Sequence, residues 1–142
     1  MKILLATDGS EHSKAAIQEL INRNLSPDTK VHIVSAFESP VLIMSAPLST
    51  RNMAPTYLDA KVMARKPAET AVENAAKLLL EENPNLSISK IVIEGSPKHS
   101  ILKEADIFRA DLIVVGSHGL SIIDRFLLGS VSQSIAYMRN AR

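Results

Sequence analysis

The sequence contains no cysteine, which excludes a disulfide framework, a thiolate metal site and a cysteine nucleophile. It also lacks any apolar run of about 18 residues, the length that a membrane-spanning helix needs, and its short apolar start meets Asp8 too soon for a signal peptide. Sixteen basic and fifteen acidic residues leave a net charge of +1, so no broad field attracts nucleic acid or a membrane surface. We therefore expect a soluble cytoplasmic protein with neither kind of partner.

The strands of the expected fold are short segments rich in β-branched and other apolar residues. They are predicted at residues 2–7, 30–37, 87–94 and 112–115. The uninterrupted apolar run of the fourth segment is typical of a strand that is buried on both faces of a parallel sheet. In the third segment, Lys90 and Glu94 interrupt the apolar residues, and charges inside a strand indicate a sheet edge.

Helical patterns separate these strands. Ser10 and Ser96 are good N-caps for two helices with an apolar face. A longer helix is expected from about 56 to 82, either kinked at Pro67 or beginning there, and we favour one kinked helix. Residues 38–55 contain three prolines and follow no regular period, which is typical of a lid or partner-binding surface, or of a poorly ordered insertion.

The alternation of strands and helices predicts the topology. Parallel strands are joined by right-handed crossovers, so the 142 residues predict one α/β domain with a doubly wound parallel sheet, Rossmann-like or flavodoxin-like, in the strand order 3-2-1-4. In such sheets a ligand binds beyond the carboxyl ends of the strands, where the order reverses. That point lies between the first and fourth strands, so Asp8 is expected opposite Gly116.

Glycines follow the fourth strand at a defined spacing. Two residues separate Gly116 from Gly119, and nine more precede Gly129 and Ser130. Glycine lets the backbone approach a ligand closely, and Ser130 is a good N-cap for a helix behind it. Unpaired N–H groups and the positive end of a helix dipole would then converge on an anion. The spacing favours a phosphate-binding loop, with a plain turn and helix cap as the alternative.

This spacing resembles the ATP-binding signature of the universal stress protein family, and the opening segment KILLATDGSEHS resembles that family's first strand and turn. The resemblance covers nearly the whole chain, including the segment from Ala110 to Gly116. It implies an ATP-binding protein of stress response or regulation, in which Mg²⁺ or Mn²⁺ accompanies the triphosphate and two copies form a homodimer. It also implies a fifth strand beside the fourth, which we expect to be missing because the chain ends at Arg142.

The resemblance also implies which residues contact the nucleotide. Ala6, Thr7, Asp8 and Ala36 are expected to line the adenosine pocket, and the glycine loop is expected to surround the ribose and phosphates. The full set of expected nucleotide-binding residues is Ala6, Thr7, Asp8, Ala36, Val115, Gly116, His118, Gly119, Gly129, Ser130, Val131 and Ser132. No catalytic residue is expected, and no protein ligand of a metal is assigned.

Other catalytic and nucleotide-binding fingerprints are missing from the sequence. No lysine follows the glycines as in a P-loop, no G-x-G-x-x-G follows the first strand, and no serine stands in a nucleophile elbow. The histidines at 12, 32, 99 and 118 lack metal-ligand spacing and are expected on the surface or at caps, except His118 within the glycine loop. We therefore expect a nucleotide-dependent switch, with a slow ATPase or phosphotransferase and a nucleotide-free dimerising adaptor as alternatives.

Overall fold

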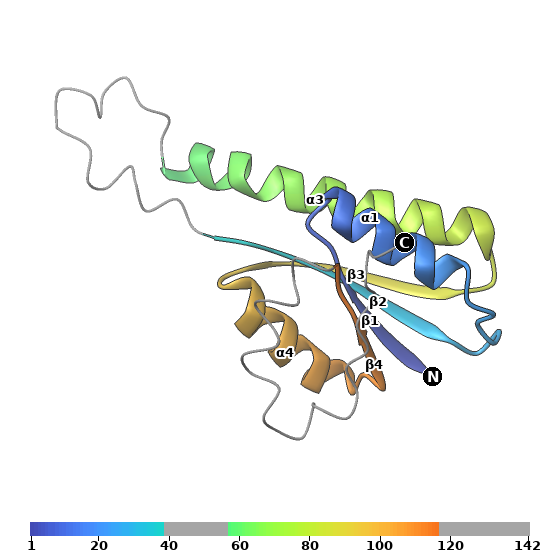
Figure 1. The fold of residues 1–142 in the computed structure, drawn as a ribbon. Helices are drawn as coiled ribbons and strands as arrows, with labels where there is room; N and C mark the ends of the chain where they lie inside the picture. Colours follow the sequence, from blue (N-terminus) through green and yellow to red (C-terminus); the bar gives the residue numbers. More distant parts are fainter. Residues whose placement is uncertain (39–56, 117–142) are drawn as a thin grey trace, which may run out of the picture.

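A computed structural model of the chain describes residues 1–38 and 57–116 (Figure 1). In these residues each of the first three strands is followed by a helix, and a fourth strand closes the series. The elements are β1 (Lys2–Ala6), α1 (Glu11–Ile21), β2 (Lys30–Phe37), α3 (Tyr57–Glu82), β3 (Ser87–Glu94), α4 (Pro97–Phe108) and β4 (Leu112–Val114). Several predictions fall on residues that the structure does not describe: the segment 38–55 beyond its first residue, the glycine loop beyond Gly116, the helix behind Ser130 and the expectation about a fifth strand.

The four described strands form one parallel sheet in the order β3-β2-β1-β4. This confirms the predicted α/β fold and the predicted strand order. The register places Leu4 of β1 between His32 of β2 and Ile113 of β4. Strands β2 and β3 lie on one side of β1, and β4 lies on the other side, so the strand order reverses between β1 and β4. The carboxyl ends of β1 and β4 therefore border the point where a ligand is expected.

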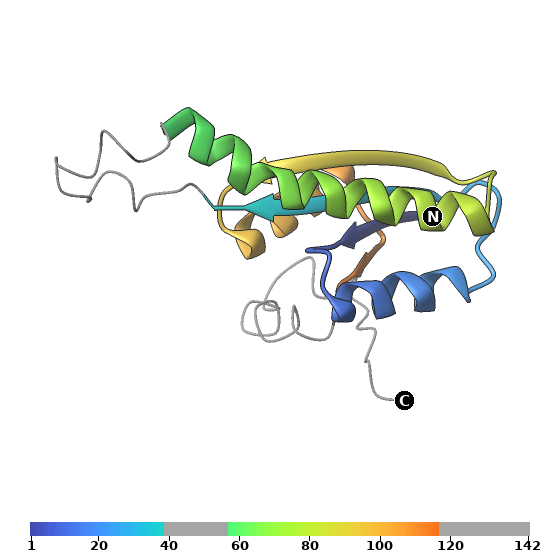
Figure 2. The ribbon, with the colours of Figure 1, turned by 90° about the horizontal axis from the view of Figure 1, so that it is seen from above.

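Helices cover both faces of the sheet. Helices α1 and α3 lie on one face and α4 lies on the other (Figure 1), and Figure 2 shows α1 and α3 side by side. The larger core cluster fills the space beneath α1 and α3, and the smaller one packs beneath α4. Ile3, Leu5 and Ile33 belong to the first cluster and Leu4 to the second, and all four are fully buried. This alternation along β1 is what a strand buried on both faces requires.

Helix α3 runs without interruption from Tyr57 to Glu82 with Pro67 inside it, which confirms the prediction of one helix rather than a helix beginning at the proline. Ion pairs join it to the edge strand β3. The ammonium of Lys61 lies 2.7 Å from a carboxylate oxygen of Glu94, and that of Lys90 lies 2.8 Å from Glu73. Both strand residues were expected to mark an edge, and β3 is the first strand of the described sheet.

In residues 1–38 and 57–116, no helix is both long and apolar enough to cross a membrane.

The helix caps follow the prediction at α1 and depart from it at α4. The Ser10 hydroxyl accepts a hydrogen bond of 3.2 Å from the backbone N–H of Ser13, as an N-cap does. Ser96 occupies the same position before α4, but its side chain makes no capping hydrogen bond. Pro97 follows it at the start of the helix, where a residue without an N–H removes one of the donors that a cap would satisfy.

The expectation that His32 lies on the surface or at a helix cap is wrong. His32 is only 8% exposed, on β2 between the sheet and α4. Both ring nitrogens have partners there, Ser89 on the neighbouring strand and Glu104 on α4. A histidine can be buried at little cost when both nitrogens are hydrogen-bonded, which explains why its polarity does not keep it at the surface.

Candidate functional site

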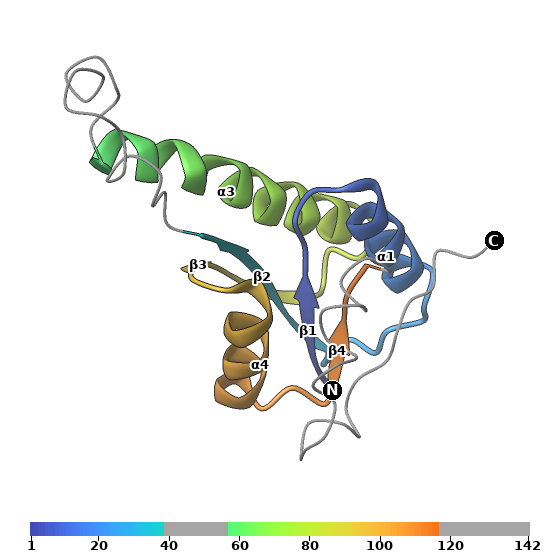
Figure 3. The ribbon, with the colours of Figure 1, turned by 60° about the vertical axis from the view of Figure 1, so that its left-hand side comes forward.

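A pocket of about 180 Å³ opens at the carboxyl ends of β1, β2 and β4, beside the N-termini of α1 and α4. Figure 3 shows β1 and β4 next to each other where the sheet order reverses. This is the position at which open parallel sheets bind ligands. The volume far exceeds the roughly 10–15 Å³ that one water molecule needs, so the pocket can admit part of an organic ligand.

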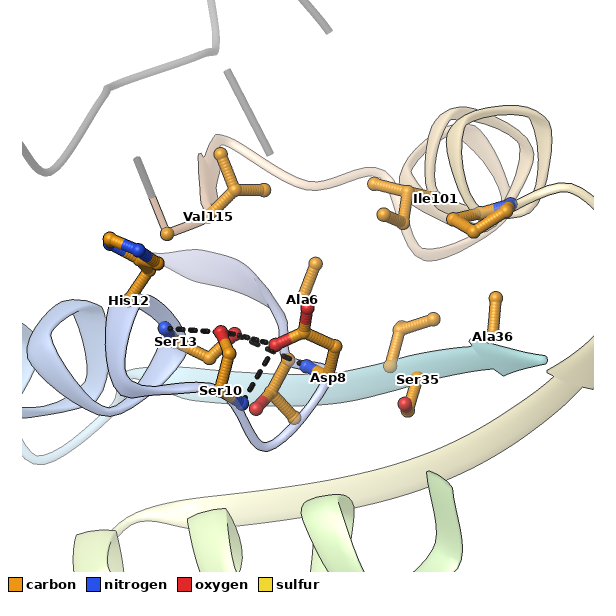
Figure 4. Close-up of a pocket in the computed structure, with 13 residues that line it drawn as sticks. Ala6, Asp8, Ser10, His12, Ser13, Ser35, Ala36, Ile101 and Val115 are labelled. Carbon is orange, nitrogen blue, oxygen red and sulfur yellow. Dashed lines mark hydrogen bonds between the residues drawn. The ribbon is translucent and has the colours of Figure 1, made fainter. Parts of the chain in front are cut away.

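One part of the pocket wall is apolar. It consists of Ala6, Val34, Ala36, Ile101 and Val115, and Pro97 lies beside them at the start of α4. In Figure 4, Ala36 and Ile101 lie on one side of the pocket, across from the α1 residues. Small and branched apolar side chains suit the faces of a flat ring, because they can contact it closely without leaving polar groups unpaired.

The opposite part of the wall is polar and is held by one hydrogen-bond network (Figure 4). The Ser13 hydroxyl donates to Asp8 Oδ1 at 2.6 Å, and the backbone N–H of Ser10 donates to the same oxygen at 2.9 Å. The backbone N–H of Asp8 in turn donates to Ser13 Oγ at 3.2 Å. The network ties the end of β1 to the first turn of α1, so the Asp8 carboxylate has a fixed position at the mouth of the pocket.

The charge of this carboxylate follows from its surroundings. Partial burial would by itself raise the pKa of Asp8, but hydrogen bonds donated by Ser10 and Ser13 outweigh burial and hold the pKa below its ordinary value. Asp8 is therefore ionised at neutral pH. Asp8 Oδ1 accepts from the Ser10 N–H and the Ser13 hydroxyl, and the carboxylate lines the pocket where a ligand hydroxyl or amine can approach it.

Two glycines shape the backbone beside this network. Gly9, in the turn after β1, has a φ of +79°, which side chains disfavour. Gly116 has a different reason to be glycine. A Cβ there would lie 2.7 Å from the carbonyl carbon of His12 and 2.9 Å from the backbone nitrogen of Ser13. The glycine spacing predicts the close approach of a ligand at this position, and the backbone of α1 adds a packing reason for glycine.

Six of the twelve residues predicted to contact a ligand line this one pocket: Ala6, Thr7, Asp8, Ala36, Val115 and Gly116. The other six lie beyond Gly116, outside the described residues. The pocket also has lining residues that the sequence analysis did not include: Ser10, His12, Ser13, Val34, Ser35, Pro97 and Ile101. Ser10, in the turn after β1, and Ser13, in the first turn of α1, could have been found from their closeness to Asp8 in the sequence. Ile101 could not, because its place depends on how α4 packs against the sheet.

The fold and the pocket together define a class of protein: an open parallel α/β protein with a pocket at the position where such proteins bind ligands, next to the reversal of the strand order. Among residues 1–38 and 57–116, no group of three histidine or acidic side chains could hold a metal ion. The sequence model of the universal stress protein family matches residues 1–137, and the chain belongs to that family.

Full-length relatives agree with this membership. The universal stress protein YxiE of Bacillus subtilis is 27% identical over 138 residues, which are 96% of this chain and 92% of the relative. A universal stress protein of Thermus aquaticus is 31% identical over 136 residues, which are 94% of this chain and 88% of the relative.

Solved structures of low sequence identity share the fold. A universal stress protein of Arabidopsis thaliana with AMP bound has a TM-score of 0.65 and 19% identity, covering 99% of this chain and 93% of that one. A universal stress protein in complex with cAMP has a TM-score of 0.60 and 21% identity, covering 97% of this chain and 96% of that one. A family member from Burkholderia pseudomallei has a TM-score of 0.70 and 15% identity, covering 96% and 94%.

Proposed function

We propose that this chain is a single adenine-nucleotide-binding domain that takes ATP at the pocket between β1 and β4 and acts as a regulatory switch in a stress response. The observation that carries the proposal is the pocket itself, with an apolar wall facing a fixed carboxylate at the point where the strand order reverses. The AMP and cAMP bound by two proteins of the same fold support an adenine nucleotide as the ligand class.

The described residues suit the two halves of an adenosine. The adenine ring would lie against the apolar wall near Ala36, Ile101 and Val115. Asp8, ionised and held by Ser10 and Ser13, would accept a hydrogen bond from a ribose hydroxyl. Such a carboxylate would repel a phosphate placed next to it, so the phosphates would extend away from Asp8.

The phosphates would bind to the glycine loop that the sequence predicts. Gly116, His118 and Gly119 would lie beside the ribose and phosphates, together with the residues that follow in the loop and its helix: Gly129, Ser130, Val131 and Ser132. Mg²⁺ or Mn²⁺ would be held mainly by phosphate oxygens and water, because the described residues offer no cluster of protein ligands for it.

We favour a switch over a catalyst that would use Asp8 as its base, because Asp8 is the one carboxylate among the described lining residues and its low pKa makes it a weak base. A homodimer and a cytoplasmic location stay predictions from the sequence. So do the alternatives of a slow ATPase or phosphotransferase and of a nucleotide-free adaptor.

The proposal is tested by releasing the ligand from purified protein with acid and identifying it by mass spectrometry. We expect an adenine nucleotide, and its absence even after incubation with ATP would favour the adaptor. Ala36→Leu should fill the apolar wall and reduce nucleotide recovery, while Ala64→Leu on α3, which does not line the pocket, should leave it unchanged. Incubation with radiolabelled ATP separates the switch from the ATPase, because only an ATPase releases phosphate steadily.

A further inference from the structure

A second polar cluster lies beneath α4, apart from the nucleotide pocket. It joins Ser89 on β3, His32 on β2 and Glu104 on α4. The Ser89 hydroxyl lies 2.6 Å from His32 Nδ1, and His32 Nε2 lies 2.8 Å from Glu104 Oε1. The first contact is a product of strand register, since His32 and Ser89 are directly paired across β2 and β3. None of the three residues lines the pocket.

The direction of the hydrogen bonds follows from the chemistry of the three groups. A carboxylate can only accept, so Glu104 receives the proton on Nε2. When the imidazole is neutral, Nδ1 is then an acceptor for the Ser89 hydroxyl. The ring is also fixed in place, because it stacks on Phe108 with a centroid distance of 4.8 Å and an interplanar angle of 27°. The Ser89 hydroxyl, the His32 imidazole and the Glu104 carboxylate therefore form a hydrogen-bonded chain, in which the carboxylate orients the imidazole and the imidazole orients the hydroxyl.

Stability alone does not require this arrangement. The side chains of His32 and Glu104 are only 10% and 13% exposed, and replacing a buried polar pair by apolar residues of similar volume is often neutral or stabilising. The neighbouring residues beneath α4, such as Leu4 and Val34, are apolar and fully buried, so apolar side chains would pack there. Ser89, by contrast, is an exposed residue, and its contact with His32 is only partly buried, so the serine lies at the boundary between this cluster and solvent.

We propose that Ser89 is a base-activated nucleophile that reacts with small activated acyl or phosphonyl esters. In the step, Ser89 Oγ forms a bond to the electrophilic carbon or phosphorus while its proton passes to His32 Nδ1. The bond to the leaving group breaks, and that group departs with the electron pair. Glu104 stabilises the imidazolium that forms, and the proton is then released to the leaving group or to water. In this arrangement the ring presents Nδ1 to the serine, whereas serine proteases present Nε2.

The edge position of β3 completes the chemistry. Among the described residues β3 pairs only with β2, so its outer edge carries backbone N–H groups that no described strand satisfies. A backbone N–H group on this edge would stabilise the negative charge on an acyl or phosphonyl oxygen that comes within about 3 Å of it. We expect small reactive esters, which need no deep binding pocket, to react at this edge strand.

The test uses the full chain and a fluorophosphonate probe, which loses fluoride when an activated serine attacks its phosphorus. Ser87 is the matched control, because it is exposed, lies on the same strand and on the same face, and pairs with Lys30 rather than with a histidine. Peptide mapping should find the label on Ser89 and not on Ser87. Ser87→Ala should be labelled at the wild-type rate, and Ser89→Ala should not be labelled at this strand.

His32→Gln should slow labelling of Ser89 by at least about 100-fold, since a positioned general base contributes roughly 10²- to 10⁴-fold. Glu104→Gln should cause a smaller loss, and its circular dichroism and melting curve show whether the fold is kept. Protein unfolded in guanidinium should lose the labelling altogether. Equal labelling of Ser87 and Ser89, or no labelling of the native wild-type protein, would overturn the proposal.

Discussion

Replacing Gly116 with alanine adds one methyl group at the point where the end of β4 meets the first turn of α1. The new Cβ would lie 2.7 Å from the carbonyl carbon of His12, 2.8 Å from its oxygen and 2.9 Å from the backbone nitrogen of Ser13. Comfortable contacts between carbon atoms need about 3.5–4.0 Å, so β4 and α1 would have to separate by roughly 1 Å. All three neighbours are backbone atoms, so no side chain can rotate away.

The loss of stability in Gly116→Ala depends on how strongly the structure resists that movement. The first turn of α1 is bound to β1 through Asp8, and Val114 and Val115 before the glycine are buried. Forcing an extra methyl group into such a place typically costs about 1–3 kcal/mol. For a chain near this length each kcal/mol lowers the melting temperature by roughly 2–4 °C. We therefore expect Gly116→Ala to melt several degrees below the wild type without any ligand present.

The assay is urea unfolding of the ligand-free protein. As a control, Gly9→Asn also replaces a glycine near α1, but a Cβ there would meet only the Ala71 methyl at 3.5 Å, and asparagine tolerates the positive φ. We expect it to cost less than the roughly 1–2 kcal/mol that most other side chains would cost in a left-handed conformation. If Gly116→Ala is as stable as wild type but binds nucleotide poorly, the glycine serves the ligand and the packing argument is refuted.

Three further predictions concern the charge, the loop and the assembly. Asp8→Asn should lower the free energy of unfolding by about 1 kcal/mol at neutral pH, because hydrogen bonds to a charged group are stronger than neutral ones. Since the folded-state pKa of Asp8 is depressed, this contribution is present above the unfolded-state pKa and is lost as the pH falls through the folded-state value, so urea unfolding of both proteins should converge in acid. Gly119→Val should abolish ATP binding while the circular dichroism spectrum is unchanged, and retained affinity would sink the phosphate-loop prediction. Sedimentation at high concentration should show a dimer, and a monomer at every concentration would contradict the expected pairing.

The sheet could be predicted because its signals are local or follow from general rules. Apolar runs and caps mark each strand and helix within a few residues, and the handedness of crossovers then limits the possible strand orders. The position of Asp8 across from Gly116 followed from that order alone. These features needed no knowledge of how particular side chains pack.

The features that could not be predicted depend on contacts between distant parts of the chain. His32 was expected at the surface or at a cap, and neither of the partners that it has in the structure is near it in sequence. Ser89 is 57 residues away and Glu104 is 72 residues away, and they meet His32 only once register and helix packing are fixed. Gly116 is similar, since its spacing to other glycines indicates a ligand while its contact with α1 is visible only in three dimensions.

The most direct test of the account is isothermal titration of nucleotide-free protein with ATP, in parallel for the wild type, Ala36→Leu and Ala64→Leu. The account predicts saturable binding of one ATP per chain to the wild type and to Ala64→Leu, with much weaker binding to Ala36→Leu. Binding of ATP to Ala36→Leu with wild-type affinity would place the nucleotide elsewhere. Absence of binding to the folded wild type would contradict the central claim that this pocket holds an adenine nucleotide.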